Sequence, residues 1–286
     1  MNDVKSKEHK MGTSKKVLSL LFALSVLFFF FGCDEGGTGG STYDIGSSAA
    51  GSGISSARVF VPSGSGVTGA ATVSGGFTNN KEQFYWLAER LQSGGIIAMA
   101  ISAANNSSIS GYERAHRDGM NLLASENTNS RSSINGRVGK RGIMGFSMGG
   151  GAVINLGSLS GVSAVVAMAP YSPNTPSRFH AAATMILTGT SDTTAPARMG
   201  EGAYNNLPST TPRLYASLSG KSHMYWMSSS RPGSEADFIV AWAQHYLNEN
   251  QSAYNVFSRG AGSGMTNYKF NPGSGTTPDP GDGGCN

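Results

Sequence analysis

The chain of 286 residues has little cysteine and little charge, and each shortage excludes a class of protein. Its two cysteines, Cys33 and Cys285, are too few for a small domain held together by a framework of disulfide bonds. No spacing of cysteine and histidine is typical of a zinc site, so we expect no bound metal. Charged residues make up only 13% of the chain, and lysine and arginine do not cluster, which argues against a nucleic-acid-binding protein.

The chain also has no apolar run long enough to cross a membrane comfortably. Residues 17–31 form an apolar stretch of 15 residues after Lys15-Lys16, and this pattern is typical of an export signal. Phe31-Gly32-Cys33 follows and resembles the lipobox of bacterial lipoproteins, in which the cysteine is lipidated. Ordinary signal cleavage and a retained anchor helix are the alternatives, and a disulfide between Cys33 and Cys285 competes with lipidation. We expect an exported protein, either secreted or tethered to the bacterial cell envelope.

Composition divides the chain into four segments. Residues 1–33 are the predicted signal peptide, and residues 34–54 are rich in glycine, serine and threonine, which predicts a flexible tether. Residues 259–286 have a similar composition with added proline and are predicted to be a disordered tail. The folded domain is therefore predicted over residues 55–258. The formal net charge of +4 comes mostly from the leader, because the first 32 residues carry five lysines against two acids.

Within the predicted domain, short apolar runs typical of strands alternate with helical patterns. The expected strands are 58–61, 70–73, 96–101, 141–145, 164–169, 185–188 and 213–218. The expected helices are 84–91, 112–126, 149–156, 197–206 and 235–250. Strands that alternate with helices predict βαβ units and a mainly parallel sheet, which is the α/β fold class.

The most informative motif is Gly145-Phe146-Ser147-Met148-Gly149, a G-x-S-x-G sequence with two more glycines behind it. The apolar run Gly142-Ile143-Met144 precedes it, and a helix pattern of small residues follows it. This strand–turn–helix context is that of a nucleophile elbow, in which a sharp turn presents the serine hydroxyl. We therefore predict that Ser147 is a catalytic nucleophile; the alternative is a glycine-rich structural turn.

A serine nucleophile needs a base and an acid that orients the base, and in this context the acid precedes the histidine in the chain. His223 lies in a polar turn directly after the expected strand 213–218, whereas His245 falls inside the last helix pattern. Asp192 directly follows the expected strand 185–188, and its carboxylate would accept the imidazole N–H. His223 and Asp192 are therefore the predicted base and acid. The alternatives are a surface loop for His223 and a helix N-cap for Asp192.

Ester hydrolysis builds a tetrahedral oxyanion, which needs two preorganised N–H donors. One predicted donor is the backbone N–H of Met148, the residue after the nucleophile. The other is the N–H of Phe77, in the glycine-rich loop 74–78 that follows the expected strand 70–73. A simple turn is the alternative for this loop. Chemistry of this kind needs no cofactor, and we expect none.

With these residues in place, the chain resembles the bacterial cutinases and poly(ethylene terephthalate) hydrolases of the α/β-hydrolase fold over residues 55–257. The motifs that carry the resemblance are Gly145–Gly151, Ala169-Pro170-Tyr171, Asp192-Thr193-Thr194-Ala195-Pro196, Ser222-His223 and Gly76-Phe77-Thr78. The resemblance implies a mostly parallel central sheet flanked by helices, with no evident lid domain. It implies a triad and an oxyanion hole made by Ser147, Asp192, His223, Phe77 and Met148. It also implies a shallow substrate cleft lined by the side chains of Phe77, Met148 and Tyr171.

Three features differ from the family pattern. Tyr171 stands where the family usually has tryptophan, and Phe146 stands where it has tryptophan or histidine. Cysteines are absent near Asp192, His223 and Phe257, so the family's disulfides, each worth about 2–4 kcal/mol of stability, are missing. These differences bear on polymer hydrolysis and on thermostability more than on ester hydrolysis.

Together these features predict a monomeric serine esterase of the cutinase or polyester-hydrolase type, with an ester or polyester as its substrate. One alternative is a dienelactone-hydrolase-like or short-chain lipase activity on small soluble esters. Another is a catalytically silent lipoprotein that binds surfaces, which the complete set of predicted triad residues argues against.

Overall fold

The computed structural model describes residues 39–46, 51–173, 180–227 and 233–274. The chain divides into residues 1–37 and residues 38–286, and every described residue belongs to the second unit. Cys33, Cys285 and the whole predicted signal peptide lie outside the described residues. Lipidation and export therefore stay predictions.

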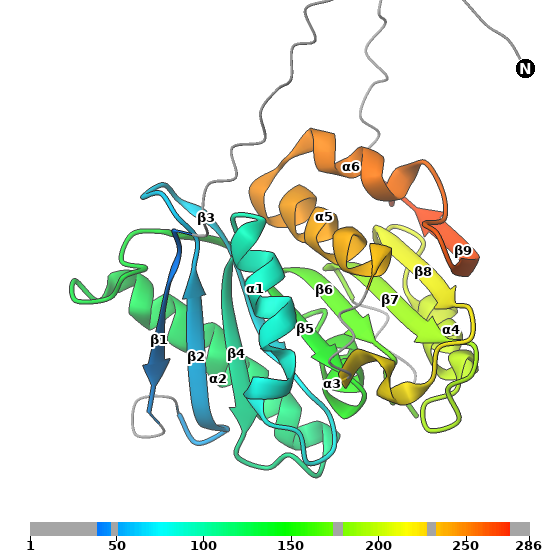
Figure 1. Ribbon diagram of the computed structural model, residues 1–286, viewed down its shortest axis with the longest axis horizontal. Helices are drawn as coiled ribbons and strands as arrows, with labels where there is room; N and C mark the ends of the chain where they lie inside the picture. The colour runs from blue at the N-terminus through cyan, green and yellow to red at the C-terminus, as the bar shows by residue number, and fades with distance from the viewer. Residues whose placement is uncertain (1–38, 47–50, 174–179, 228–232, 275–286) are drawn as a thin grey trace, which may run out of the picture. The chain divides into compact units, whose positions relative to one another are not determined.

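A single sheet forms the centre of the domain (Figure 1). Its nine strands are β1 (Ser41–Ile45), β2 (Ile54–Val61), β3 (Thr68–Ser74), β4 (Ile97–Ala103), β5 (Val138–Phe146), β6 (Val162–Met168), β7 (Ala183–Gly189), β8 (Arg213–Leu218) and β9 (Met265–Asn271). Their order is β1-β2-β4-β3-β5-β6-β7-β8-β9. The strands from β4 to β8 in this order run parallel, while β2 and β9 pair antiparallel at their two sides and β1 pairs antiparallel with β2. The expected mainly parallel α/β architecture is confirmed.

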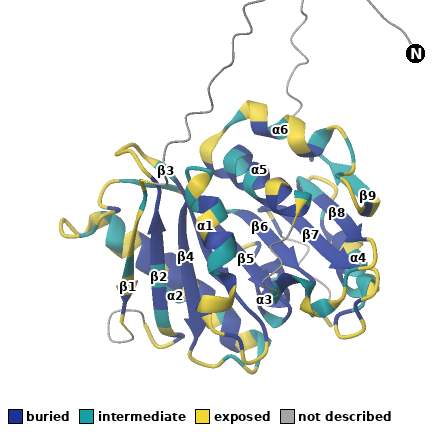
Figure 2. Cartoon of the chain, viewed as in Figure 1, coloured by how far each residue is buried: buried dark blue, intermediate teal, exposed yellow. Residues whose placement is uncertain are grey.

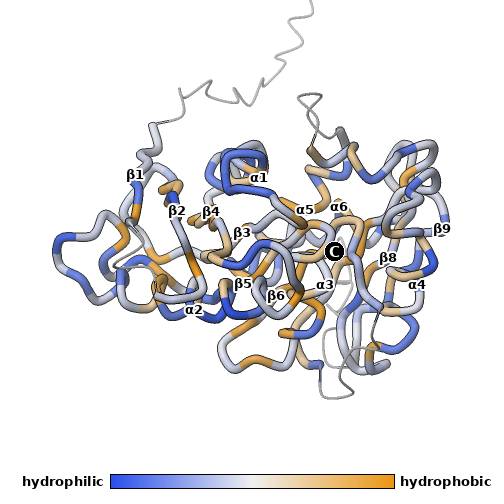
Figure 3. Tube along the Cα trace, turned by 90° about the horizontal axis from the view of Figure 1, so that it is seen from below, coloured by the Kyte–Doolittle hydropathy of each residue, from blue (hydrophilic) through white to orange (hydrophobic). Residues whose placement is uncertain are grey.

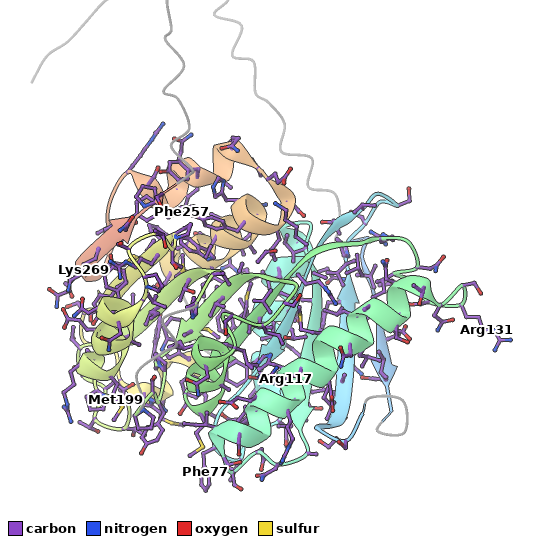
Figure 4. All side chains as sticks on the ribbon, turned by 180° about the vertical axis from the view of Figure 1, so that it is seen from behind. Phe77, Arg117, Arg131, Met199, Phe257 and Lys269 are labelled. Atoms are coloured by element: carbon purple, nitrogen blue, oxygen red, sulfur yellow. The ribbon has the colours of Figure 1, made fainter. Side chains whose placement is uncertain are left out.

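Helices cover both faces of the sheet (Figures 1 and 4). One face carries α1 (Tyr85–Ser93), α5 (Ser234–Asn248) and α6 (Gln251–Ser258), and the other carries α2 (Ile109–Thr128), α3 (Met148–Asn155) and α4 (Ala197–Asn206). In the described part of the chain, two short 3₁₀ helices, η1 (Lys81–Phe84) and η2 (His223–Met227), lie in the loops. None of the helices in the described part of the chain has the length and hydrophobicity needed to span a bilayer.

Burial follows directly from this two-sided covering. β4 and β7 are buried along their whole length, which explains why their sequences are mostly apolar on both faces rather than alternating between apolar and polar residues (Figure 2). The helices are amphipathic instead: α1 is largely hydrophilic in Figure 3, yet it buries Leu87, Ala88 and Leu91 against the sheet. On the same face, Trp242 of α5 packs its ring 4.9 Å from the ring of Phe257 in α6.

The N-terminal boundary of the domain differs from the prediction. Within the segment 34–54, predicted to be a tether, Ser41–Ile45 forms the edge strand β1. The Tyr43 side chain reaches the C-terminal end of α2, where its hydroxyl donates a hydrogen bond to Glu126. Ile45, at the end of the strand, is buried. Only two alternate residues of the strand carry large apolar side chains, so the surrounding glycine and serine hid the period-two pattern.

The C-terminal boundary also differs. Within the segment 259–286, predicted to be disordered, Met265–Asn271 forms β9 and pairs with β8. Asn267 has a positive φ of 51° where the β8–β9 register shifts, so Met265 and the later aromatic residues of β9 do not alternate regularly. This bulge is the physical reason that the segment lacks a recognisable strand pattern.

The sheet topology gathers the predicted site residues. The parallel strands β3, β5, β7 and β8 all end at the same edge of the sheet. The loops that follow them carry, in that order, Phe77, Ser147, Asp192 and His223. In an open parallel sheet this carboxyl edge is where ligands usually bind.

Candidate active site

Ser147 lies on a strained turn between β5 and α3. Its backbone has φ 54° and ψ −116°, a conformation that a residue with a side chain adopts only when its surroundings impose it. Three hydrogen bonds impose it: the Ser147 N–H donates to the Met168 carbonyl (3.0 Å), and the Ser147 carbonyl accepts from Gly151 (2.9 Å) and Tyr171 (2.8 Å). The turn is thus held from inside the elbow and from the end of β6.

The glycines around Ser147 allow three segments to approach it closely. A Cβ atom on Gly145 would lie 2.3 Å from the Gly149 carbonyl oxygen, and one on Gly149 would lie 2.2 Å from the Gly75 carbonyl oxygen. A Cβ on Gly151 would lie 2.2 Å from the Tyr171 carbonyl oxygen. None of these distances is possible for a real side chain, so the glycines are required by packing.

His223 joins the serine to a buried carboxylate. Its Nε2 lies 2.9 Å from Ser147 Oγ, and its Nδ1 lies 2.7 Å from Asp192 Oδ2. A carboxylate only accepts hydrogen bonds, so Nδ1–H donates to Asp192 and the neutral ring keeps Nε2 free to accept the serine proton. The structure therefore brings together the three residues that the sequence selected.

Asp192 is held on both of its oxygens. While Oδ2 accepts from His223, Oδ1 accepts the backbone N–H groups of Thr194 (2.9 Å) and Ala195 (2.8 Å), and the side chain has no exposed surface. The N-cap alternative fails for α4, which begins after Pro196. These N–H donors stabilise a buried charge that also orients the imidazole.

The acid loop and the base loop are joined directly to each other. Ser191 N–H donates to the Lys221 carbonyl (3.0 Å), Thr190 N–H donates to the Leu218 carbonyl (3.0 Å), and Gly220 N–H donates to Thr190 Oγ1 (2.8 Å). These bonds fix the separation of Asp192 from His223. No cysteine occurs among the described residues, so hydrogen bonds rather than a disulfide join the two loops.

The loop after β3 lies directly against the nucleophile. A Cβ on Gly76 would lie 2.5 Å from the Ser147 Cβ. Within the loop, the N–H groups of Gly76, Thr78 and Asn79 bond to Asn79 Oδ1, the Asn106 carbonyl and the Gly76 carbonyl, and the N–H of Phe77 is used by none of these bonds. Met148 is the first residue of α3, where helix geometry leaves the N–H without an intrahelical acceptor. Both predicted oxyanion donors thus flank Ser147.

Comparison with known proteins places this site in a family. A model of the family described as "PET hydrolase-like" matches residues 35–271 of the chain. The chain belongs to this family. The match covers both corrected edge strands, β1 and β9, as well as every loop of the site.

Individual relatives are distant. The bis(hydroxyethyl) terephthalate hydrolase of Streptomyces coelicolor is 28% identical over 211 residues, which are 71% of this chain and 66% of that protein. Cutinase est1 of Thermobifida alba is 27% identical, over 69% of this chain and 67% of its own length. A cutinase of Thermobifida fusca is 26% identical, over 72% of this chain and 68% of its own. The alignments therefore span about two thirds of the length of these relatives.

Phe146, which differs from the PET hydrolase-like pattern, has a structural role in this chain. Its side chain is buried rather than open to the cleft, with its ring centre 4.8 Å from that of His223 and 5.5 Å from that of Phe84. An apolar ring packed on the imidazole restricts its rotation and keeps water from that face. Phe146 therefore supports the base.

The residues predicted to line the cleft differ in exposure. Phe77 is 58% exposed and projects from the surface beside the N-terminal end of α2 (Figure 4). Met148 and Tyr171 are half-buried. The sequence reasoning missed Met224, which directly follows His223 and is also 58% exposed. The apolar run Met224-Tyr225-Trp226 after a polar turn was the available signal.

The remaining described histidines form no hydrogen bond with Ser147, Asp192 or His223. His116 and His180 are buried and bond to Thr72, Ser74 and Thr184. His245, in α5, packs against Tyr246, Tyr254 and Phe257. In the described ranges no three His, Cys, Asp or Glu side chains gather in a way that could hold a metal ion.

Proposed function

We propose that the protein is a serine esterase that hydrolyses carboxylic esters by way of an acyl-enzyme. The observation that carries this proposal is the continuous hydrogen-bond chain from Asp192 through His223 to Ser147, on a serine held at positive φ. The names of the relatives, cutinases and a bis(hydroxyethyl) terephthalate hydrolase, support the same reaction class.

In the proposed mechanism, Ser147 Oγ attacks the ester carbonyl carbon while His223 Nε2 takes the hydroxyl proton. The carbonyl oxygen becomes an oxyanion that accepts the N–H groups of Phe77 and Met148. His223 then gives the proton to the departing alcohol, which leaves an acyl group on Ser147. A water molecule, deprotonated by His223, repeats the attack and releases the acid. Asp192 stabilises the imidazolium in both halves.

The exposed apolar side chains beside the triad favour a polyester or another bulky ester as the substrate. Phe77 and Met224 follow residues that contact Ser147, so they flank the serine from the oxyanion loop and from the base loop. Exposed rings and thioethers adjacent to a nucleophile can pack on the acyl or aromatic units of a chain too large to be enclosed. We therefore propose the cutinase and polyester-hydrolase type of esterase.

The reaction class is tested by replacing the nucleophile. Ser147→Ala is expected to lower the rate of p-nitrophenyl butyrate hydrolysis by about 10⁴-fold or more. Ser93→Ala is the matched control, because Ser93 is an exposed serine of α1 that bonds only within its own helix. If the Ser147→Ala enzyme keeps the activity of the control, the mechanism is wrong.

The substrate class is tested by comparing a polyester film with soluble esters of rising acyl length. Release of soluble acid from the film, lost in Ser147→Ala and reduced when Phe77 and Met224 are replaced by serine, supports the polyester assignment. Hydrolysis of the soluble esters without any release from the film supports the dienelactone-hydrolase-like or short-chain lipase alternative instead.

We also propose that the protein is exported and tethered through a lipid on Cys33. The support is the sequence alone: a basic start, an apolar core and Phe31-Gly32-Cys33. In a bacterial host, Cys33→Ser is expected to move the protein from the membrane fraction to the soluble fraction and to abolish palmitate labelling. An unlabelled native protein found entirely in the medium would contradict the tether.

A further inference from the structure

The peptide group between Gly76 and Phe77 has two ends with different tasks. Its N–H, on Phe77, is the oxyanion donor of the proposed mechanism. Its C=O, on Gly76, accepts two hydrogen bonds, one from the Asn79 N–H (2.9 Å) and one from the phenol of Tyr112. Because a peptide group is rigid and planar, whatever fixes the carbonyl also fixes the direction of the N–H.

Tyr112 reaches this carbonyl from helix α2. It lies in the first turns of α2, it is completely buried, and it packs in the core between α2 and the sheet. Burial raises the pKa of its phenol above the ordinary value, so the group stays protonated and can serve as a donor to the carbonyl.

The position of Tyr112 is itself fixed one turn later in the same helix. His116 lies between two hydroxyls of β3, with Nδ1 2.7 Å from Thr72 Oγ1 and Nε2 2.8 Å from Ser74 Oγ. A Cβ on Gly119 would lie 2.8 Å from Thr72 Cγ2, so the helix lies close against the strand here. α2 is therefore held against β3 directly below the oxyanion loop.

We propose that Tyr112 is a positioning residue that orients and polarises the Gly76–Phe77 peptide for oxyanion stabilisation. The inference rests on the proposed function, since it assigns a part in that mechanism to a side chain outside the triad. Glycine at positions 75 and 76 leaves the loop backbone free to rotate unless other groups hold it. A hydrogen bond to the carbonyl also draws electron density from the N–H, which makes the N–H a stronger donor.

The test is Tyr112→Phe, which removes one hydroxyl and keeps the buried ring. Complete loss of an oxyanion donor costs about 10²–10³ in rate, and Asn79 still holds the carbonyl in this variant, so we expect kcat to fall about 10-fold. KM for p-nitrophenyl butyrate should stay the same, because the ground-state ester is not held by a developed charge. The pH dependence of kcat should keep its midpoint, because Tyr112 does not contact His223.

Tyr268→Phe is the matched control. The Tyr268 phenol also donates to a backbone carbonyl, that of Phe257, but this bond joins β9 to α6 and not to any loop of the site. This variant should lose stability and keep its kcat. Inactivation by a fluorophosphonate, which forms a tetrahedral adduct with an oxygen in the oxyanion hole, should slow in Tyr112→Phe by the same factor as kcat and stay unchanged in Tyr268→Phe.

The outcomes separate this inference from the proposed function. If Ser147→Ala is inactive while Tyr112→Phe keeps the kcat of Tyr268→Phe, the role of Tyr112 is overturned and the mechanism stands. If Ser147→Ala is active, the mechanism itself fails. If Tyr112→Phe does not fold, the inference is tested with 3-fluorotyrosine incorporated at position 112. This residue keeps the hydrogen bond to Gly76 but has a more acidic phenol, which is a stronger donor. A higher kcat supports the inference, and an unchanged or lower kcat overturns it.

Discussion

The positions of single residues at this site depend on contacts with little tolerance. A Cβ atom on Gly76 would collide with Ser147, and the Phe146 ring packs on the His223 imidazole at 4.8 Å. The sequence selected Ser147 and His223 from their motif and order. It gave no sign that Phe146 packs on the base or that Tyr112 bonds to the oxyanion loop, because such contacts join residues far apart in the chain.

His116 provides a test at the residue scale. Burial lowers its pKa to about 3 from the ordinary 6.5, so between these values the unfolded chain binds a proton that the folded protein does not. Its contribution to stability is complete above pH 6.5 and is lost as the pH falls, by at most about 1.4 kcal/mol per pH unit. Urea unfolding at pH 7 and pH 4.5 should show a smaller drop in His116→Gln than in the native chain. Equal drops would show that His116 does not titrate on unfolding.

At the scale of elements, the helices pack through small residues at defined positions. In α4, a Cβ on Gly200 would lie 2.5 Å from Thr188 Cγ2 and 3.0 Å from Ile186 Cγ2 of β7, whereas a Cβ on Gly202 would meet no atom within 4 Å. The helix pattern predicted α4 over 197–206, and its bounds are Ala197–Asn206. The pattern could not tell which of its glycines faces the sheet, because both are equally small.

Replacing these two glycines gives opposite predictions within one helix. Gly202→Ala is expected to stabilise the protein by about 0.5–1 kcal/mol, because alanine loses less backbone entropy in a helix. Gly200→Ala is expected to destabilise it by about 1–3 kcal/mol through overpacking against β7. The midpoint of thermal unfolding measures both, and a shift of the same sign in the two variants would show that α4 is placed differently.

At the scale of the whole molecule, the sheet is wider than the sequence indicated. β1 and β9 add an edge strand at each side, from segments whose glycine and serine content predicted a tether and a tail. β9 pairs with β8, the strand that leads to His223, and brings Phe270 within 5.7 Å of the Phe257 ring. The domain that carries the site therefore needs residues beyond 258.

Two C-terminal truncations test this boundary. Deletion of residues 275–286 keeps β9 and its pairing with β8, and we expect the esterase activity to be retained. Deletion of residues 259–286 also removes β9, which exposes the edge of β8 and the ring of Phe257, so we expect a large loss of soluble protein and a lower unfolding midpoint. Equal stability of the two truncations would show that β9 does not stabilise the domain.

The sequence by itself determined the α/β class, the parallel core strands and the order of Ser147, Asp192 and His223, because apolar periodicity and the elbow motif are local signals. The tertiary structure alone decided the edge strands, the packing of Phe146 on the base and the bond from Tyr112 to the oxyanion loop. Those features depend on register, on a bulge and on the approach of a helix to a strand. Such relations arise only when distant segments pack together, and no local pattern records them.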